Sequence, residues 1–162
     1  MIFHISIAAD NPYHVGKVLA EIFKGDCIEF APHPGSYMTL AFDQYGTAIE
    51  VYPRGTELKP GTNEQELQFF NNDASSKFTA THAAIAVPLN QQEIEKIGER
   101  EQWRVVRCSR KGYFDVMELW IENTVLLELL TPEMADQYTQ VMEPKNLTQL
   151  IEQFKREKAI KN

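Results

Sequence analysis

Two pairs of histidine and glutamate occur at the same spacing in this sequence of 162 residues. Within each pair the two residues are 46 positions apart, and the second pair follows the first at an offset of 78. Histidine is rare, at 4 residues of 162, so this repetition is informative. Imidazole nitrogens and carboxylate oxygens are ligands of divalent transition metals. The spacing therefore predicts a single metal site formed by His4, Glu50, His82 and Glu128.

The neighbours of these residues favour a cavity around them. Glu50 and Glu128 each interrupt a run of apolar residues that has the character of a strand. A carboxylate in such a run is costly to bury unless it is paired or bound to a cation. Side chains alternate between the two faces of a strand. The residues that would share a face with each histidine are small, and they are Ser6, Ala8, Ala80, Ala84 and Ala86.

The offset of 78 predicts two copies of a module in which one strand and one helix precede three further strands. In the first copy the strands are expected at 3–9, 27–31, 37–42 and 47–52, with a helix capped by Asn11 and ended by Gly25. In the second copy they are expected at 81–87, 104–108, 114–121 and 124–130, with a helix capped by Asn90. An ungapped superposition places Phe42 on Trp120.

The predicted organisation is α+β: a first βαβββ module at 1–53, a connector at 54–80, a second module at 81–131 and a helical extension at 132–162. The connector is long for a bare loop, so we expect it to hold some structure of its own and to bury Leu67, Phe69 and Phe70. The helical extension is expected to contribute packing or a dimer contact.

Composition limits the classes of partner. The formal charge of −7 argues against nucleic acid, because phosphate contacts require a basic surface. No apolar run approaches the length of a membrane span, and the N-terminus lacks the pattern of a signal peptide. Cys27 and Cys108 cannot form a disulfide framework and are expected to be reduced thiols. Together these features predict a cytoplasmic protein.

One motif resembles a known family. Residues 43–50, Asp-Gln-Tyr-Gly-Thr-Ala-Ile-Glu, are similar to the D-x-x-G-x-x-I-E turn and final strand of the vicinal oxygen chelate superfamily, and of bacterial glyoxalase I in particular. The second copy keeps Leu127-Glu128-Leu129 but has Glu122-Asn123-Thr124 in place of the turn. The resemblance covers residues 2–131. It implies two U-shaped, mostly antiparallel sheets that curve over a metal, with the modules paired within one chain or across a homodimer.

The resemblance also implies an activity. Two imidazoles and two carboxylates would hold Ni, Co, Fe, Mn or Zn and leave positions for an oxygen-chelating small molecule. The chemistry would be a proton transfer of the lyase or isomerase type, with Glu128 as the first candidate for the base and Glu50 as the second. Residues that would line the substrate cavity, or simply pack the sheet, are Tyr37, Tyr52, Arg54 and Trp120. The sequence Ile7-Ala8-Ala9-Asp10 offers no arginine for a glutathione carboxylate.

Three other interpretations remain open. A ring-cleaving dioxygenase of the same superfamily uses two histidines and one carboxylate, so the fourth ligand predicted here argues against it. A binding protein of the bleomycin-resistance type would sequester a small molecule without catalysis. A metal-free descendant would retain the His–Glu pairs as hydrogen-bonded structural elements.

Overall fold

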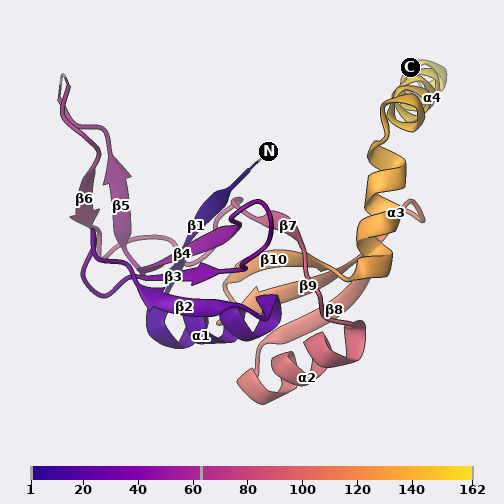
Figure 1. Ribbon diagram of the computed structural model, residues 1–162. Coiled ribbons are helices and arrows are strands. Elements are labelled where there is room, and N and C mark those ends of the chain that lie inside the picture. Colours follow the sequence, from indigo (N-terminus) through magenta and orange to yellow (C-terminus); the bar gives the residue numbers. More distant parts are fainter. Residues whose placement is uncertain (1, 63, 162) are drawn as a thin grey trace.

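The computed structural model describes residues 2–62 and 64–161, with side chains for all of these except 154 and 157–161. Two four-stranded sheets form its body, and each carries a helix along one face (Figure 1). The first sheet has the order β1-β4-β3-β2 and the second β7-β10-β9-β8. In each sheet the first strand pairs in parallel with the last, and the other pairings are antiparallel.

The elements of the first module are β1 (His4–Ala9), α1 (Pro12–Phe23), β2 (Asp26–Glu29), β3 (Tyr37–Leu40) and β4 (Ala48–Pro53). Those of the second are β7 (Ala83–Ala86), α2 (Gln91–Glu101), β8 (Arg104–Ser109), β9 (Asp115–Ile121) and β10 (Val125–Leu130). The chain therefore has the α+β fold of two tandem βαβββ modules that the sequence predicts.

Strand register shows where the two modules match and where they do not. Ile5 pairs with Ile49 and Ala83 with Leu127, so both partners shift by 78. The third strand differs. Met38 lies opposite Glu50, and Glu118 lies opposite Glu128, so the counterpart of Met38 is 80 and not 78 residues further along the chain. In the β8–β9 hairpin the chain between the paired residues Arg104 and Trp120 is two residues longer than the chain between Asp26 and Leu40 in the β2–β3 hairpin. The turn between β9 and β10 is two residues shorter than the turn between β3 and β4.

The ungapped superposition of Phe42 on Trp120 is therefore wrong. Trp120 pairs with Arg104 on β8, and its counterpart is Leu40, which pairs with Asp26 on β2. Phe42 lies in the loop between β3 and β4, where it is 72% exposed.

Helix α1 begins as its sequence predicts. Asn11 accepts a hydrogen bond from the backbone N–H of His14, and Pro12 occupies the first turn. The left-handed residue at its end is Lys24, not Gly25. Gly25 is needed for a different reason, because a Cβ there would lie 1.8 Å from the carbonyl oxygen of Leu40. The helix buries one apolar face against the first sheet, made by Val15, Val18, Leu19, Ile22 and Phe23.

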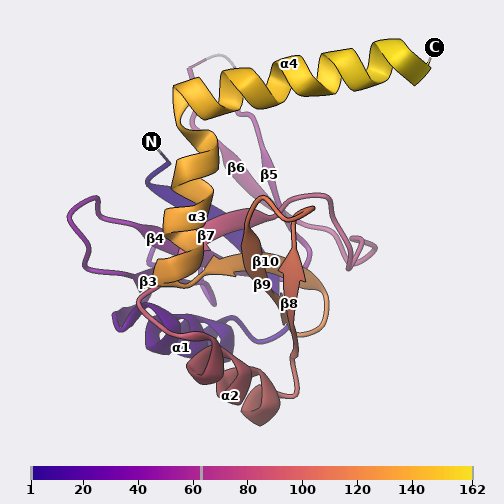
Figure 2. The same ribbon diagram turned by 90° about the vertical axis from the view of Figure 1, so that its right-hand side faces the viewer.

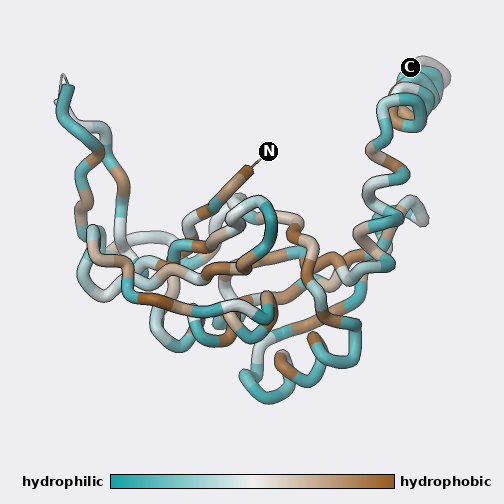
Figure 3. The backbone as a smooth tube through the Cα atoms, in the orientation of Figure 1, coloured by the Kyte–Doolittle hydropathy of each residue, from teal (hydrophilic) through white to brown (hydrophobic). Residues whose placement is uncertain are grey.

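Helix α2 also begins at the predicted cap. Asn90 and Glu93 form a reciprocal capping box, and Leu89 and Ile94 are both buried. Most of its surface is polar, and the hydropathy colouring in Figure 3 shows the apolar residues gathered on the side that meets the sheet.

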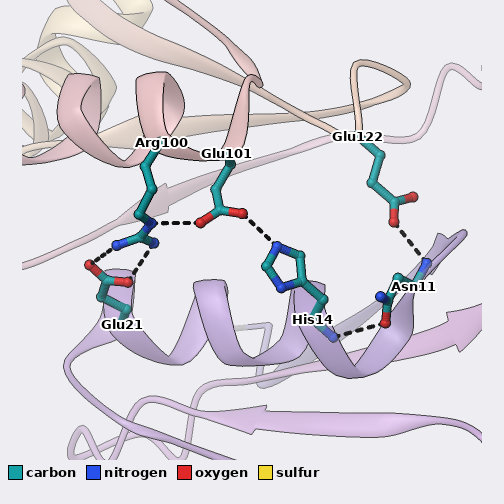
Figure 4. Close-up of polar contacts among 6 residues, drawn as sticks. All are labelled: Asn11, His14, Glu21, Arg100, Glu101 and Glu122. Atoms are coloured by element: carbon teal, nitrogen blue, oxygen red, sulfur yellow. Dashed lines mark hydrogen bonds and ion pairs between the residues drawn. The ribbon is translucent and has the colours of Figure 1, made fainter.

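Ion pairs join the two modules through their helices (Figure 4). His14 on α1 lies 2.5 Å from Glu101 on α2, and Arg100 on α2 forms a two-pronged pair with Glu21 on α1. At the other end of α1, Glu122 accepts hydrogen bonds from the backbone N–H groups of residues 10 and 11. Among the described residues, no helix is both long and apolar enough to cross a membrane.

Two arms extend from this body (Figures 1 and 2). The hairpin arm consists of β5 (Thr56–Lys59) and β6 (Gln68–Asn71), and the helical arm consists of α3 (Pro132–Met142) and α4 (Pro144–Lys161). Of the connector residues expected to be buried, Phe69 is half-buried, but Leu67 is 53% and Phe70 43% exposed. The expectation was wrong for these two because the hairpin lies outside the core.

Candidate functional site

Glu50 is the best-supported candidate in the first module. It lies on the face of β4 opposite α1, and its side chain is only 11% exposed. Its Oε2 atom accepts hydrogen bonds from the Ser6 hydroxyl at 2.8 Å and the Tyr52 hydroxyl at 3.0 Å. Its Oε1 atom lies 3.9 Å from Nε2 of His4, which is 58% exposed at the start of β1. Two neutral hydroxyls thus orient the carboxylate, and its second oxygen faces an imidazole.

Tyr52 belongs to an aromatic cluster beside this carboxylate. Its ring lies 5.9 Å from Phe30, 5.4 Å from His33 and 5.7 Å from Phe69, measured between centroids. Burial, and then the hydrogen bond and the charge of Glu50, raise the pKa of Tyr52 to about 12. Phe69 comes from β6, so the hairpin arm is rooted in the same cluster.

Glu128 in the second module has a different environment. Arg110 forms an ion pair with it and another, at 3.0 Å, with Glu118. These hydrogen bonds raise the pKa of Arg110 further above its usual range. Glu118 lies directly across the ladder from Glu128. Burial raises the pKa of Glu118, but hydrogen bonds from Arg110 and Trp120 outweigh it and lower the pKa. Arg104 adds a longer contact with Glu118, at 3.4 Å, so two guanidinium groups already face the two carboxylates of this part of the second sheet.

His82 lies just before β7 and is exposed. Its Nδ1 atom is 3.2 Å from the carbonyl oxygen of Ala80. A carbonyl only accepts, so Nδ1 donates this hydrogen bond, and Nε2 has no hydrogen-bond partner among the described residues. Histidines that bind metals commonly have their second nitrogen held in this way.

The structure brings His4 and Glu50 together but does not gather the predicted set of four. Among the described residues of one chain, no three histidine, cysteine, aspartate or glutamate side chains are placed to hold a metal ion. As a single chain, the protein presents one His–Glu pair on the first sheet and a glutamate engaged by Arg110 on the second.

The four residues considered for the substrate cavity have distinct positions. Tyr37 lies on the α1 side of the first sheet, where its ring packs 5.1 Å from Tyr13. Arg54 bridges the modules, with hydrogen bonds to Asp10, Glu122 and Thr124. Trp120 donates a hydrogen bond of 3.3 Å to Glu118. Only Tyr52 contacts a candidate ligand residue.

Sequence reasoning missed Arg110 and Glu118. The run from Arg104 to Lys111 has the character of a solvated strand face, and Arg107 indeed pairs with Asp115 on the surface. The signal that could have identified Arg110 is the pairing of Glu118 with Glu128, because like charges directly opposite one another are destabilising and a nearby cation relieves the repulsion.

A cavity of about 600 Å³ lies at the seam between the modules. It runs between β1 and β7, the first strands of the two sheets, and its lining is mostly apolar. His4 belongs to its wall, together with Phe3, Ile5, Phe23, Ala83 and Ile85. His4 is thus next to a space large enough for a small molecule, whereas Glu50 is not part of its lining.

No protein-family model matches the sequence, and no curated protein matches it either. Solved structures do resemble the chain. They include the fosfomycin resistance protein FosX from Listeria monocytogenes (15% identity, 85% of this chain and 97% of that chain covered, TM-score 0.50). A putative glyoxalase family protein from Bacillus anthracis matches at 12% identity, covering 80% and 92%, with a TM-score of 0.51.

A lactoylglutathione lyase from Agrobacterium tumefaciens matches at 9% identity, covering 82% of this chain and 93% of that chain, with a TM-score of 0.50. At these identities the likeness concerns the fold. It agrees with the element order and with the register repeated between the two sheets. The chain has the fold of the vicinal oxygen chelate superfamily.

Proposed function

We propose that the protein is a metal-dependent enzyme of the lyase or isomerase type that acts on a small molecule chelating through two oxygens. The observation that carries the proposal is the environment of Glu50. This carboxylate is buried, its hydrogen-bond donors Ser6 and Tyr52 are neutral, and the basic group facing it is His4 at 3.9 Å. A buried carboxylate in such a setting favours a cation.

The remaining ligands would come from a second copy of the chain. His82 is exposed, and its Nε2 has no hydrogen-bond partner within the described part of the chain, so it is suited to reach a neighbouring molecule. Glu128 would have to separate from Arg110, which would keep its pair with Glu118. The donor set of two imidazoles and two carboxylates suits Ni, Co, Fe, Mn or Zn.

The roles of the protein groups follow from their positions. A divalent ion at this site would act as a Lewis acid for negative charge on a substrate oxygen. Glu128, or else Glu50, would move the proton on the adjacent carbon. Ser6 and Tyr52 would hold Glu50 in one orientation, and the apolar cavity whose wall includes His4 would accept part of the substrate. Two structural neighbours are named for small molecules, lactoylglutathione and fosfomycin, which supports a small-molecule partner.

Metal binding tests the proposal directly. Elemental analysis and calorimetric titration of purified protein should give near-stoichiometric divalent metal, lost in Glu50→Gln and in His4→Ala. Glu99→Gln, on the exposed surface of α2, is the matched control and should bind as the wild type does. A wild-type protein that binds none of the five metals at micromolar supply would reject the proposal. Solvent deuterium exchange into substrate under argon separates an isomerase from an oxygen-consuming dioxygenase.

The ion pair of Arg110 with Glu128 favours a second candidate, a metal-free small-molecule binding protein. In that case Arg110 serves as the permanent cation of the second sheet, and a ligand occupies the cavity at the seam. Thermal stabilisation by a small-molecule panel in excess EDTA, retained in Glu50→Gln, is the result expected of this alternative and not of the enzyme.

A further inference from the structure

The two arms rise from opposite ends of the body on the same side, away from α1 and α2 (Figure 1). Figure 2 shows α4 running across the end of α3, well clear of the sheets. Its main packing partner is α3. The hairpin arm likewise packs on the body at its root, where Phe69 meets Tyr52 and His33.

Neither arm is well stabilised by the contacts of a single chain. An isolated two-stranded hairpin is marginally stable in water, and so is a lone helix of this length. Both arms also expose apolar side chains. Those on the hairpin arm and its tip are Leu58, Leu67 and Phe70, and those on the helical arm are Met142 and Ile151.

The hairpin arm is acidic and α4 is basic, whereas α3, the other half of the helical arm, carries the acids Glu133 and Asp136. On the hairpin arm Glu57 is paired with Lys59, and the exposed tip adds two acids, Glu64 and Glu66. On α4 the described charged side chains are three bases, Lys145, Lys155 and Arg156, against one acid, Glu152. An acidic apolar ribbon and a basic apolar helix are complementary surfaces.

We propose that the arms clasp a second copy of the chain, with the hairpin arm of each copy against α4 of the other. A twofold axis perpendicular to the line between the arms places the hairpin arm of one copy opposite the helical arm of the other. The same rotation forms the reciprocal contact, so the dimer has two identical contacts. A second copy is favoured because each chain supplies both halves of the complementary pair. The clasp needs no metal, and so it stands independently of the proposed active site.

Charge reversal and its rescue test the clasp. Analytical ultracentrifugation should show a dimer for the wild type. Glu64→Lys with Glu66→Lys should weaken dimerisation about tenfold or more, as should Lys155→Glu with Arg156→Glu, because each change places like charges in both contacts. Combining all four substitutions in one chain should restore the dimer. The control is Lys96→Glu with Glu99→Lys on α2, which should leave it unchanged.

Rescue separates the clasp from damage to folding, since the fourfold variant contains every substitution of the weakened proteins. Reversals without effect, a fourfold variant no tighter than the double variants, or a monomeric wild type would each overturn the clasp. Metal content of the same samples reports on the proposed function separately. A metal-free dimer with the expected rescue would reject the metal site and support the clasp.

Discussion

The hydroxyl of Tyr52 donates a hydrogen bond of 3.0 Å to Oε2 of Glu50, two residues before it on β4. Successive side chains of a strand alternate, so these two share a face and the phenol is held against the carboxylate. The pairing makes Tyr52 a reporter of the charge on Glu50.

Tyrosine titration should detect that charge. In EDTA-treated protein, absorbance near 295 nm should show one tyrosine ionising with a pKa of about 12. Burial contributes most to the shift, and the hydrogen bond and charge of Glu50 add to it. Glu50→Gln should therefore lower this pKa toward the ordinary value of 10, and Tyr52→Phe should remove the late transition. A late transition unchanged in Glu50→Gln would contradict the pairing.

Removal of Arg110 should destabilise the second sheet. Arg110→Met leaves Glu128 facing Glu118 across the ladder without its guanidinium partner, while Arg104 still contacts Glu118 at 3.4 Å. We expect a loss of about 1–3 kcal/mol in the free energy of unfolding, measured with urea at pH 7. Adding Glu118→Gln should recover part of it. Arg107→Met, which breaks a more exposed pair with Asp115, should cost under about 1 kcal/mol.

Acid should weaken the contact between the helices shown in Figure 4. Burial raises the pKa of Glu101, but hydrogen bonds from Arg100 and His14 outweigh it and lower the pKa below the ordinary 4.5. A group with a lowered folded pKa contributes stability above its unfolded pKa and loses it as pH falls through the folded pKa. Glu101→Gln should thus cost about 1 kcal/mol at pH 7, and this cost should shrink as the pH falls below 4.5 and through the lowered folded pKa. A cost that stays constant as the pH is lowered to the acid unfolding transition would refute this origin.

Two glycines should respond differently to alanine. A Cβ at Gly25 would lie 1.8 Å from the backbone oxygen of Leu40, so Gly25→Ala requires backbone movement and should cost about 3 kcal/mol or prevent folding. Gly46 has a φ of +68°, and a Cβ added there would meet no other atom within 4 Å. Gly46→Ala should cost only about 1 kcal/mol, from backbone conformation alone. Urea unfolding of both variants checks the ranking.

Much of the fold could be predicted because its signals are local. Caps, turn residues and alternating apolar residues identify the modules, and a repeated His–Glu spacing aligns β1 with β7 and β4 with β10. The third strand, β3 or β9, could not be aligned from the sequence. The β8–β9 hairpin has two residues more than β2–β3, and the β9–β10 turn has two fewer than the β3–β4 turn, so the two modules have the same total length.

The candidate site was harder to predict because it depends on contacts between strands. Spacing identifies Glu50 and Glu128 as equivalent positions, but it does not reveal that one is held by Ser6 and Tyr52 and the other by Arg110. The counterparts of the two hydroxyl residues are Ala84 and Leu130, neither of which can donate a side-chain hydrogen bond. Arg110 compensates from the turn that follows β8.

The packing of Phe69 on Tyr52 joins the hairpin arm to the candidate site, since one ring touches the arm and its hydroxyl holds Glu50. Thermodynamic linkage makes such a connection reciprocal: if occupancy at Glu50 alters the arm's preferred position, engagement of the arm alters affinity at Glu50 by the same factor. If the arms clasp a second copy, the hairpin arm would therefore couple the Glu50 site of one chain to the Glu50 site of the other.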